Sequence, residues 1–301
     1  MEKMKIDQEE HIASILNNQR SARNEGKFDL AEKIANEGEE YLNQLPEETC
    51  LVYWSRLSYE KAFMLSIKGM PEEAAKYFLL SGEYAHKNGD QTRKAIGDFR
   101  YALTLYLAGL IDSNETFEKI SEVYQIQNNI SEVPLGDEGL LENSKFNTLK
   151  RLCELSFGKN KNEYLGVADI ILSSDFLVRS VLQPQAMYEI LRWQITARKA
   201  MINENYIRAI SILSGLLDFK ITGIKVDDVF IEQKEMFSNG LETTEELSRE
   251  YRDFGRAIMK SDIENKEKWA AKVWHQGLEI PKGRGNLIFL RDIQNDLGTL
   301  T

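Results

Sequence analysis

Residues 68–74 read Lys68-Gly69-Met70-Pro71-Glu72-Glu73-Ala74, where one helical run stops at a glycine and the next opens on a proline. The same pattern recurs at 25–31, 161–168 and 204–209: a small or polar turn residue, then an aromatic residue or a proline, and then an alanine. One helical pair of this kind cannot bury its apolar face alone, so each pair must stack on its neighbour. The pattern predicts an all-α solenoid, a class of fold that mostly binds other proteins.

Composition narrows the classes to which the protein could belong. With 301 residues and a formal charge of -10, the chain lacks the basic face typical of nucleic-acid binding, so we expect no nucleic-acid partner. No run approaches about 18 apolar residues, and the first residues are charged without an apolar signal region. We therefore expect no membrane partner and a soluble, cytoplasmic protein, and we leave the oligomeric state open. Cys50 and Cys153 lie in apolar helical contexts without metal-like spacing, which predicts reduced, buried thiols.

Turn signals and apolar periodicity predict an almost entirely helical chain. Gly89 followed by Asp90 indicates a helix stop and a capped restart, and Pro71 suits a first helical turn because its missing N–H costs nothing there. The segment 220–226 is the best strand candidate, but a lone strand would have no partner. The predicted helices are 7–24, 28–43, 48–68, 71–87, 91–109, 114–127, 138–157, 162–173, 184–202, 204–218, 226–239, 242–262 and 264–277.

The best-defined pair resembles a tetratricopeptide repeat, in which two antiparallel helices carry a large residue early in the first helix and small residues at set positions after it. Its spacings of 4, 3, 6, 3 and 4 residues agree with that family and run through Trp193, Ala197, Ala200, Tyr206, Ala209 and Leu213. Glycines at the turns lie 43, 40 and 49 residues apart, at Gly26, Gly69, Gly109 and Gly158. These intervals exceed the family repeat of about 34 residues, so the resemblance is to a longer, degenerate form. It implies a right-handed α-solenoid of antiparallel helix pairs over 1–218 and a C-terminal helical capping segment over 219–301.

The resemblance also implies that the first helices of the pairs line a concave groove. The groove positions carried over to this sequence are Arg20, Arg23, Asn24, Arg56, Tyr59, Phe63, Arg100, Tyr101, Gln194 and Arg198. Arginine forks pair with carboxylate or phosphate through two hydrogen bonds at once, and nearby aromatic rings can take an apolar anchor. We expect Arg20, Arg56 and Arg198 to project into one concavity. The expected function is a protein- or peptide-binding scaffold or adaptor, such as a regulatory subunit, that binds an acidic or C-terminal segment.

Two other functions compete with the scaffold. The chain resembles bacterial repeat proteins that sense short peptides and sequester a partner, but these usually carry an N-terminal DNA-binding module, and none fits before Phe28. An enzyme is not expected, because no nucleophile–base pair can be nominated and no cofactor motif is present. No metal site is expected either, since the histidines lack ligand spacing and the clustered glutamates fit a solvated helix face. These residues are His11, His86, His275, Glu37, Glu39 and Glu40.

Overall fold

The computed structural model describes residues 5–131, 133, 138–157, 161–173, 185–235, 237, 247–281 and 286–300. Within these residues it contains fourteen α-helices and no β-strand, so the all-α prediction is confirmed for them. The chain divides into two compact units, residues 1–144 and 145–301. We describe each unit by itself.

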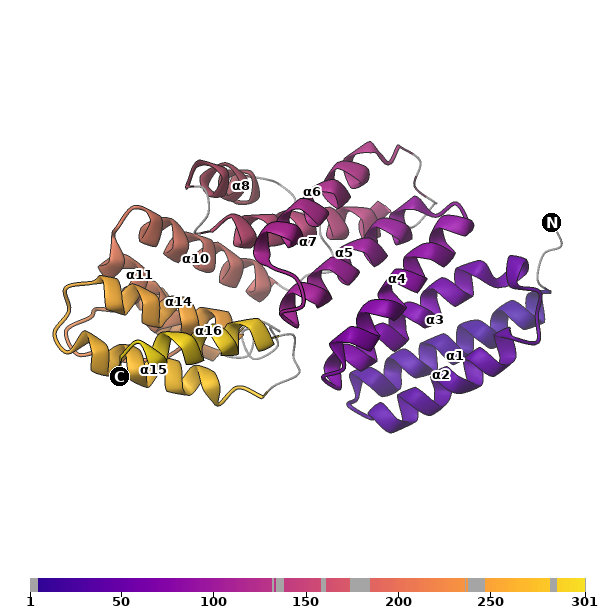
Figure 1. The fold of residues 1–301 in the computed structure, drawn as a ribbon, viewed down its shortest axis with the longest axis horizontal. Coiled ribbons are helices and arrows are strands. Elements are labelled where there is room, and N and C mark those ends of the chain that lie inside the picture. Colours follow the sequence, from indigo (N-terminus) through magenta and orange to yellow (C-terminus); the bar gives the residue numbers. More distant parts are fainter. Residues whose placement is uncertain are drawn as a thin grey trace. The chain divides into compact units, whose positions relative to one another are not determined.

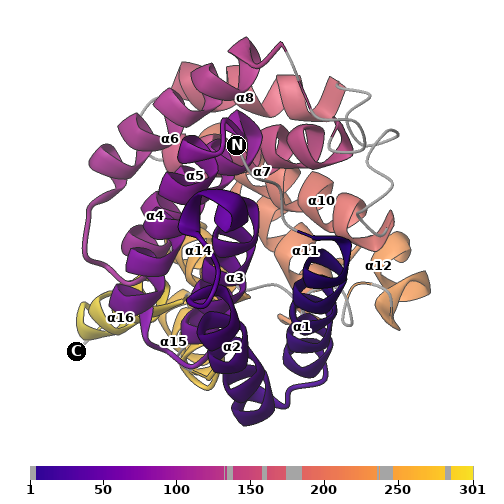
Figure 2. The same cartoon turned by 90° about the vertical axis from the view of Figure 1, so that its right-hand side faces the viewer.

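Unit 1 (residues 1–144) is built from consecutive antiparallel helices, and each helix from α1 to α5 packs on the next (Figure 1). The first helices of successive pairs also touch, since α1 contacts α3 and α3 contacts α5. Figure 2 shows unit 1 from the end at which α1, α2 and α3 lie. The helices are α1 (Ile6–Asn24), α2 (Phe28–Leu42), α3 (Glu47–Ile67), α4 (Pro71–Lys87), α5 (Gln91–Leu107), α6 (Ser113–Asn129) and the start of α7 (Glu138–Ser156).

Four helices of unit 1, α1, α3, α4 and α5, end in turns of one type. In each turn a glycine adopts a positive φ of 72–79°, and the N–H of the following residue donates to the carbonyl five residues earlier at 2.9 Å. Glycine suits this helix end because it has no Cβ to clash in the left-handed conformation. These glycines are Gly26, Gly69, Gly89 and Gly109. The predicted restart after Gly89 is confirmed, since the Asp90 carboxylate accepts from the Arg93 N–H at 2.9 Å.

Close backbone approach joins the middle helices of unit 1. A Cβ on Gly97 in α5 would lie 2.9 Å from the Gly82 Cα in α4, so only glycine fits where these helices cross. Beside this crossing, α3 and α4 are tied by two reciprocal hydrogen bonds. Ser55 Oγ donates to the Ser81 carbonyl at 2.9 Å, and Ser81 Oγ donates to the Ser55 carbonyl at 2.8 Å.

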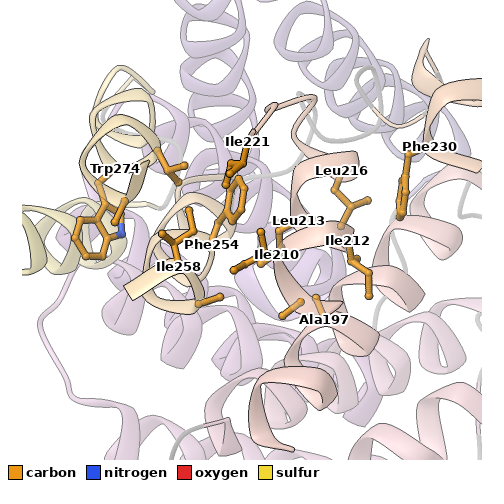
Figure 3. Packing of buried hydrophobic residues seen from close by; sticks show 14 of the residues in the cluster. Ala197, Ile210, Ile212, Leu213, Leu216, Ile221, Phe230, Phe254, Ile258 and Trp274 are labelled. Atoms are coloured by element: carbon orange, nitrogen blue, oxygen red, sulfur yellow. The ribbon is translucent and has the colours of Figure 1, made fainter. Parts of the chain in front are cut away.

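Unit 2 (residues 145–301) has one continuous apolar core, part of which is drawn in Figure 3. Ala197 and Ala209 are fully buried in it, at positions where the sequence predicts close helix packing. The core also contains Phe254 and Trp274, so residues on both sides of the expected boundary at 218 share it. The helices are the rest of α7, α8 (Lys161–Ser173), α10 (Gln185–Ile202), α11 (Tyr206–Leu216), α12 (Asp228–Glu232), α14 (Leu247–Lys260), α15 (Lys266–Leu278) and α16 (Leu287–Gly298).

The predicted helices agree with the structure to within a few residues over most of the chain, and the differences gather near the C-terminal end. The last helix, α16 (Leu287–Gly298), has no counterpart among the predicted helices. The helix predicted over 226–239 is interrupted: α12 spans Asp228–Glu232, a turn follows at Gln233, and residues 234, 235 and 237 are helical again. The segment 220–226 contains a turn at Gly223 and no strand. The turn predicted at Gly158 lies outside the described residues, as do 242–246 of the predicted helix 242–262.

Candidate functional site

Two adjoining cavities open on unit 1, with volumes of about 130 and 350 Å³. We call their common wall, formed by Arg20, Arg56, Glu60, Arg93 and Leu140, the unit 1 groove. Its residues come from α1, α3, α5 and α7, which are the first helices of the successive pairs. The remaining lining residues are Ala13, Leu16, Asn17, Ser55, Tyr59, Ser81 and Ile96.

Helical periodicity explains why these side chains face the same way. Residues three or four positions apart lie on one face of a helix, and Leu16 and Arg20 of α1 have this spacing. On α3 the same holds for Arg56 and Glu60. Because α1 contacts α3 and α3 contacts α5, the faces of these three helices form one continuous wall.

The polar centre of the unit 1 groove is Glu60, which is only 3% exposed. Arg20 Nε donates to Glu60 Oε1 at 2.9 Å, and Arg23 Nε lies 3.4 Å from Glu60 Oε2. The Arg20 side chain nevertheless remains 58% exposed, so part of its guanidinium faces the groove. The lining of the two cavities carries three arginines and one glutamate, a formal charge of +2 in a chain whose net charge is -10. The groove is therefore a local basic site on an acidic protein.

An aromatic cluster adjoins the groove. The guanidinium carbons of Arg23 and Arg100 lie 4.7 and 5.2 Å from the ring centroid of Phe63, within range of cation–π attraction. Tyr59, which lines the smaller cavity, packs edge-on against Phe78 with ring centroids 5.4 Å apart. These contacts hold the arginines and Tyr59 in defined positions.

The structure brings together part of the set of groove residues predicted from the sequence. Arg20, Arg56 and Tyr59 line the cavities, and the next turn of the same helix faces carries Arg23, Phe63 and Arg100. Besides Arg23, Phe63 and Arg100, two more predicted residues of unit 1 line neither cavity. They are Asn24, exposed at the end of α1, and Tyr101, half-buried on α5.

Arg93 is a groove residue that sequence reasoning missed. It stands seven residues before Arg100, so both share one face of α5, and this spacing is the signal that could have identified it. Its Nε lies 3.1 Å from Oδ2 of Asp90, the residue that caps α5. The helix cap therefore also positions a groove arginine.

Arg198 and Gln194 belong to unit 2, and both are 3% exposed. The expectation that Arg198 projects toward solvent is therefore wrong. Its Nη2 lies 2.7 Å from Glu250 Oε1 and 2.9 Å from Asp253 Oδ2, both on α14. Helical spacing correctly places Gln194 and Arg198 on one face of α10, but this face meets carboxylates of another helix.

The charges around Arg198 form a buried cluster that perturbs their titration. Burial lowers the pKa of Arg198, but the Glu250 and Asp253 carboxylates outweigh burial and raise this pKa overall. Burial likewise raises the pKa of Asp253, but the guanidinium groups of Arg252 and Arg198 outweigh it and hold this pKa well below its usual range. Arg198 and Asp253 therefore stay charged near neutral pH, and each has an oppositely charged partner.

The remaining candidate residues do not gather into a group that could bind a common ligand. Among the described residues, no three His, Cys, Asp or Glu side chains gather in a way that could hold a metal ion. Glu39 is paired with Lys61 at 2.7 Å, and His11 packs edge-on against Tyr41.

Both cysteines are free and buried, which confirms the prediction of buried, unpaired thiols. Burial raises the pKa of the Cys153 thiol to about 12, and burial also raises the pKa of Cys50. The thiols are therefore poor nucleophiles in the native state.

Comparisons with known proteins add no family. No protein-family model matches the chain, and no curated protein sequence matches it significantly. Along the described helices, none combines the length and the apolar character that crossing a bilayer requires.

Proposed function

We propose that the unit 1 groove binds an acidic segment of a partner protein or peptide, and that the chain acts as a binding scaffold such as an adaptor or regulatory subunit. The observation that carries this proposal is the convergence of Arg20, Arg56 and Arg93, from three successive first helices, on adjoining cavities. Guanidinium groups recognise carboxylates through paired hydrogen bonds, and a basic site on an acidic chain favours an anionic ligand. The proposed role is binding alone and involves no catalytic step.

The uncharged part of the lining supports a peptide more than a simple anion. Leu16, Ile96 and Leu140 provide apolar surface beside the arginines, and Tyr59 adds an aromatic face. A peptide can place a carboxylate on the arginines and an apolar side chain against this surface, which is the usual arrangement of anchors in protein interfaces. The hydroxyl groups of Ser55 and Ser81 already donate to backbone carbonyls, so they lock α3 to α4.

The resemblance to tetratricopeptide repeats supports the same proposal. Successive antiparallel pairs and contacts between first helices are features of such arrays, and the glycine turns 43 and 40 residues apart correspond to a longer form of the repeat of about 34 residues. In these arrays the first helices form the binding face, and α1, α3 and α5 line the groove here.

The test is partner capture with and without the groove arginines. Proteins captured from a cell extract are quantified by mass spectrometry for the wild type and for Arg20→Gln/Arg56→Gln. Glutamine is preferred at position 20 because its amide still donates to Glu60, whereas glutamate would place a second carboxylate beside a buried one. Lys33→Gln/Lys76→Gln is the control, because it removes the same charge from exposed positions on the second helices α2 and α4.

We expect the arginine variant to lose captured partners that the lysine control retains. For an acidic peptide taken from such a partner, fluorescence anisotropy should show affinity at least about tenfold lower, the loss of roughly one charge-assisted hydrogen bond. Wild-type affinity should fall as salt rises, since the screening length is about 10 Å at 0.1 M. Equal capture by wild type and arginine variant, with both folded by circular dichroism, would remove the groove as the binding site.

A further inference from the structure

Unit 2 contains a cavity of its own, with a volume of about 390 Å³. This volume falls within the range of roughly 300–1,000 Å³ that small-molecule sites occupy. Its walls combine apolar side chains, among them Phe157, Met201 and Tyr206, with three charged groups. The charged residues are Lys161 at the start of α8, Lys260 at the end of α14 and Glu204 in the turn between α10 and α11.

Glu204 has an unfavourable backbone conformation. Its φ is 58°, and the turn has the same hydrogen-bond pattern as the glycine turns of unit 1, with the Asn205 N–H donating to the Ala200 carbonyl at 2.9 Å. The described chain has two other non-glycine residues with positive φ, Asp218 and Asn265, and both are of types that tolerate this region. Glutamate is not such a type, so Glu204 destabilises a turn in which glycine would fit.

Strained residues that persist in this way tend to lie at binding sites, where the side chain has a use that offsets the strain. Here the strained residue is also one of the three charges that line the cavity. Glu204, Lys161 and Lys260 form no ion pair with any residue that the structure describes. Two independent observations, the cavity and the strain, therefore meet at Glu204.

We propose that this cavity binds a small zwitterion with an apolar body. The Glu204 carboxylate would receive the ammonium group, the two lysines would receive the carboxylate, and Phe157 and Tyr206 would cover the apolar part. Free apolar amino acids and apolar dipeptides share this chemistry. The proposal does not depend on the unit 1 groove.

Isothermal titration calorimetry on the full chain tests the ligand class. The probes are leucine, phenylalanine and the dipeptide Leu-Phe, together with acetyl-Leu-Phe and Leu-Phe amide. We expect the zwitterionic probes to bind and each blocked dipeptide to bind at least about tenfold more weakly, because each lacks one charged contact. Tighter binding of leucine or phenylalanine than of Leu-Phe would assign the site to amino acids, and the reverse order would assign it to dipeptides. Absence of binding by all three zwitterions at millimolar concentration would overturn the proposal.

Two substitutions at one position separate charge from strain. Glu204→Gln keeps the strained conformation and removes the charge, so it should bind the best zwitterion at least about tenfold more weakly at an unchanged melting temperature. Glu204→Gly removes both, so it should lose binding to a similar degree while the melting temperature rises by a few degrees. Unchanged binding by Glu204→Gln, or no rise in melting temperature for Glu204→Gly, would refute the assignment. Arg56→Gln in unit 1 should leave zwitterion binding intact, which keeps this test separate from that of the groove.

Discussion

Replacing Arg198 with methionine should destabilise unit 2 strongly, because it removes a buried cation and leaves its partners in place. Arg198 is 3% exposed and contacts Glu250 at 2.7 Å and Asp253 at 2.9 Å. Methionine is of similar length, so the substitution removes charge and hydrogen bonds more than volume. The two carboxylates would keep their neighbours Arg249 and Arg252 but lose their shared partner.

The magnitude follows from the burial of the cluster. Removing one partner of a buried ion pair costs about 3–5 kcal/mol, since the charge left behind is desolvated without compensation. For a unit of this size, a loss of 1 kcal/mol lowers the melting temperature by about 2–4 °C, so the expected shift is roughly 6–20 °C. The control is Arg256→Met on α14, the helix that carries Glu250 and Asp253; the Arg256 side chain is 40% exposed and pairs with Asp296 at 2.6 Å. An exposed pair contributes about 0–1 kcal/mol, so the control should change the free energy of unfolding little.

The assay is urea unfolding followed by tryptophan fluorescence. Three of the four tryptophans, Trp193, Trp269 and Trp274, belong to unit 2, so the signal reports mainly on that unit. The measurement that decides is the difference in unfolding free energy between Arg198→Met and Arg256→Met at pH 7. If the two variants were equally stable, the buried cluster would contribute no more than a surface pair, and the reasoning would be refuted.

The pH dependence provides a second check on the same cluster. The native pKa of Asp253 is lowered, so between that pKa and the ordinary value of about 3.9 the unfolded chain binds more protons than the native one. The stabilisation from Asp253 is therefore complete above about pH 5 and is lost as the pH falls through the native pKa. Removing Arg198 raises that pKa, so the deficit of Arg198→Met should shrink as the pH falls from about 5 toward about 2. A deficit independent of pH would contradict this account.

Two further predictions concern packing and thiol reactivity. Gly97→Ala should destabilise unit 1 by about 1–3 kcal/mol in thermal unfolding, because its Cβ would meet the Gly82 backbone at 2.9 Å. The control is Gly166→Ala in α8, whose Cβ would meet nothing within 4 Å. This control should stabilise the protein by roughly 0.5–1 kcal/mol, because alanine has a higher helix propensity than glycine. Equal effects of the two glycine variants would show that α4 and α5 do not cross as closely as the structure has them. Cys50 and Cys153 should resist Ellman's reagent in the native protein and react fully in urea, since burial both raises their pKa and blocks access; rapid native labelling of either would contradict its burial.

The helix boundaries were predictable where the signal is local. A glycine able to adopt positive φ, followed by Asp90 or Pro71, ends one helix and starts the next through contacts within a few residues. Helix α16 was missed although Asn286 is of a residue type that often caps helices. Asn286 makes no capping hydrogen bond there, and its amide donates instead to Ser248 Oγ at 3.0 Å and to the Pro281 carbonyl at 3.1 Å. The residue type alone does not reveal whether a side chain caps a helix or makes a long-range contact.

The same difference between local and long-range signals applies to the residues of the candidate site. The resemblance to tetratricopeptide repeats placed Arg20 and Arg56 on helix faces that line a groove, and both residues line the cavities of unit 1. A position on a helix face does not reveal what that face meets. Arg198 has an equally regular position on α10, yet its partners lie 52 and 55 residues further along the chain.

By itself, the sequence determined the helices, their turns and the faces their side chains occupy, because backbone hydrogen bonds, glycine torsions and the 3.6-residue period are all local. Only the tertiary structure decided which arginine is solvated and which is buried. Burial depends on which helices pack together, and that packing also decides whether an arginine is enclosed in the core, as Arg198 is, or lines a cavity, as Arg56 does. The strain at Glu204 likewise becomes visible only once the chain has its backbone conformation.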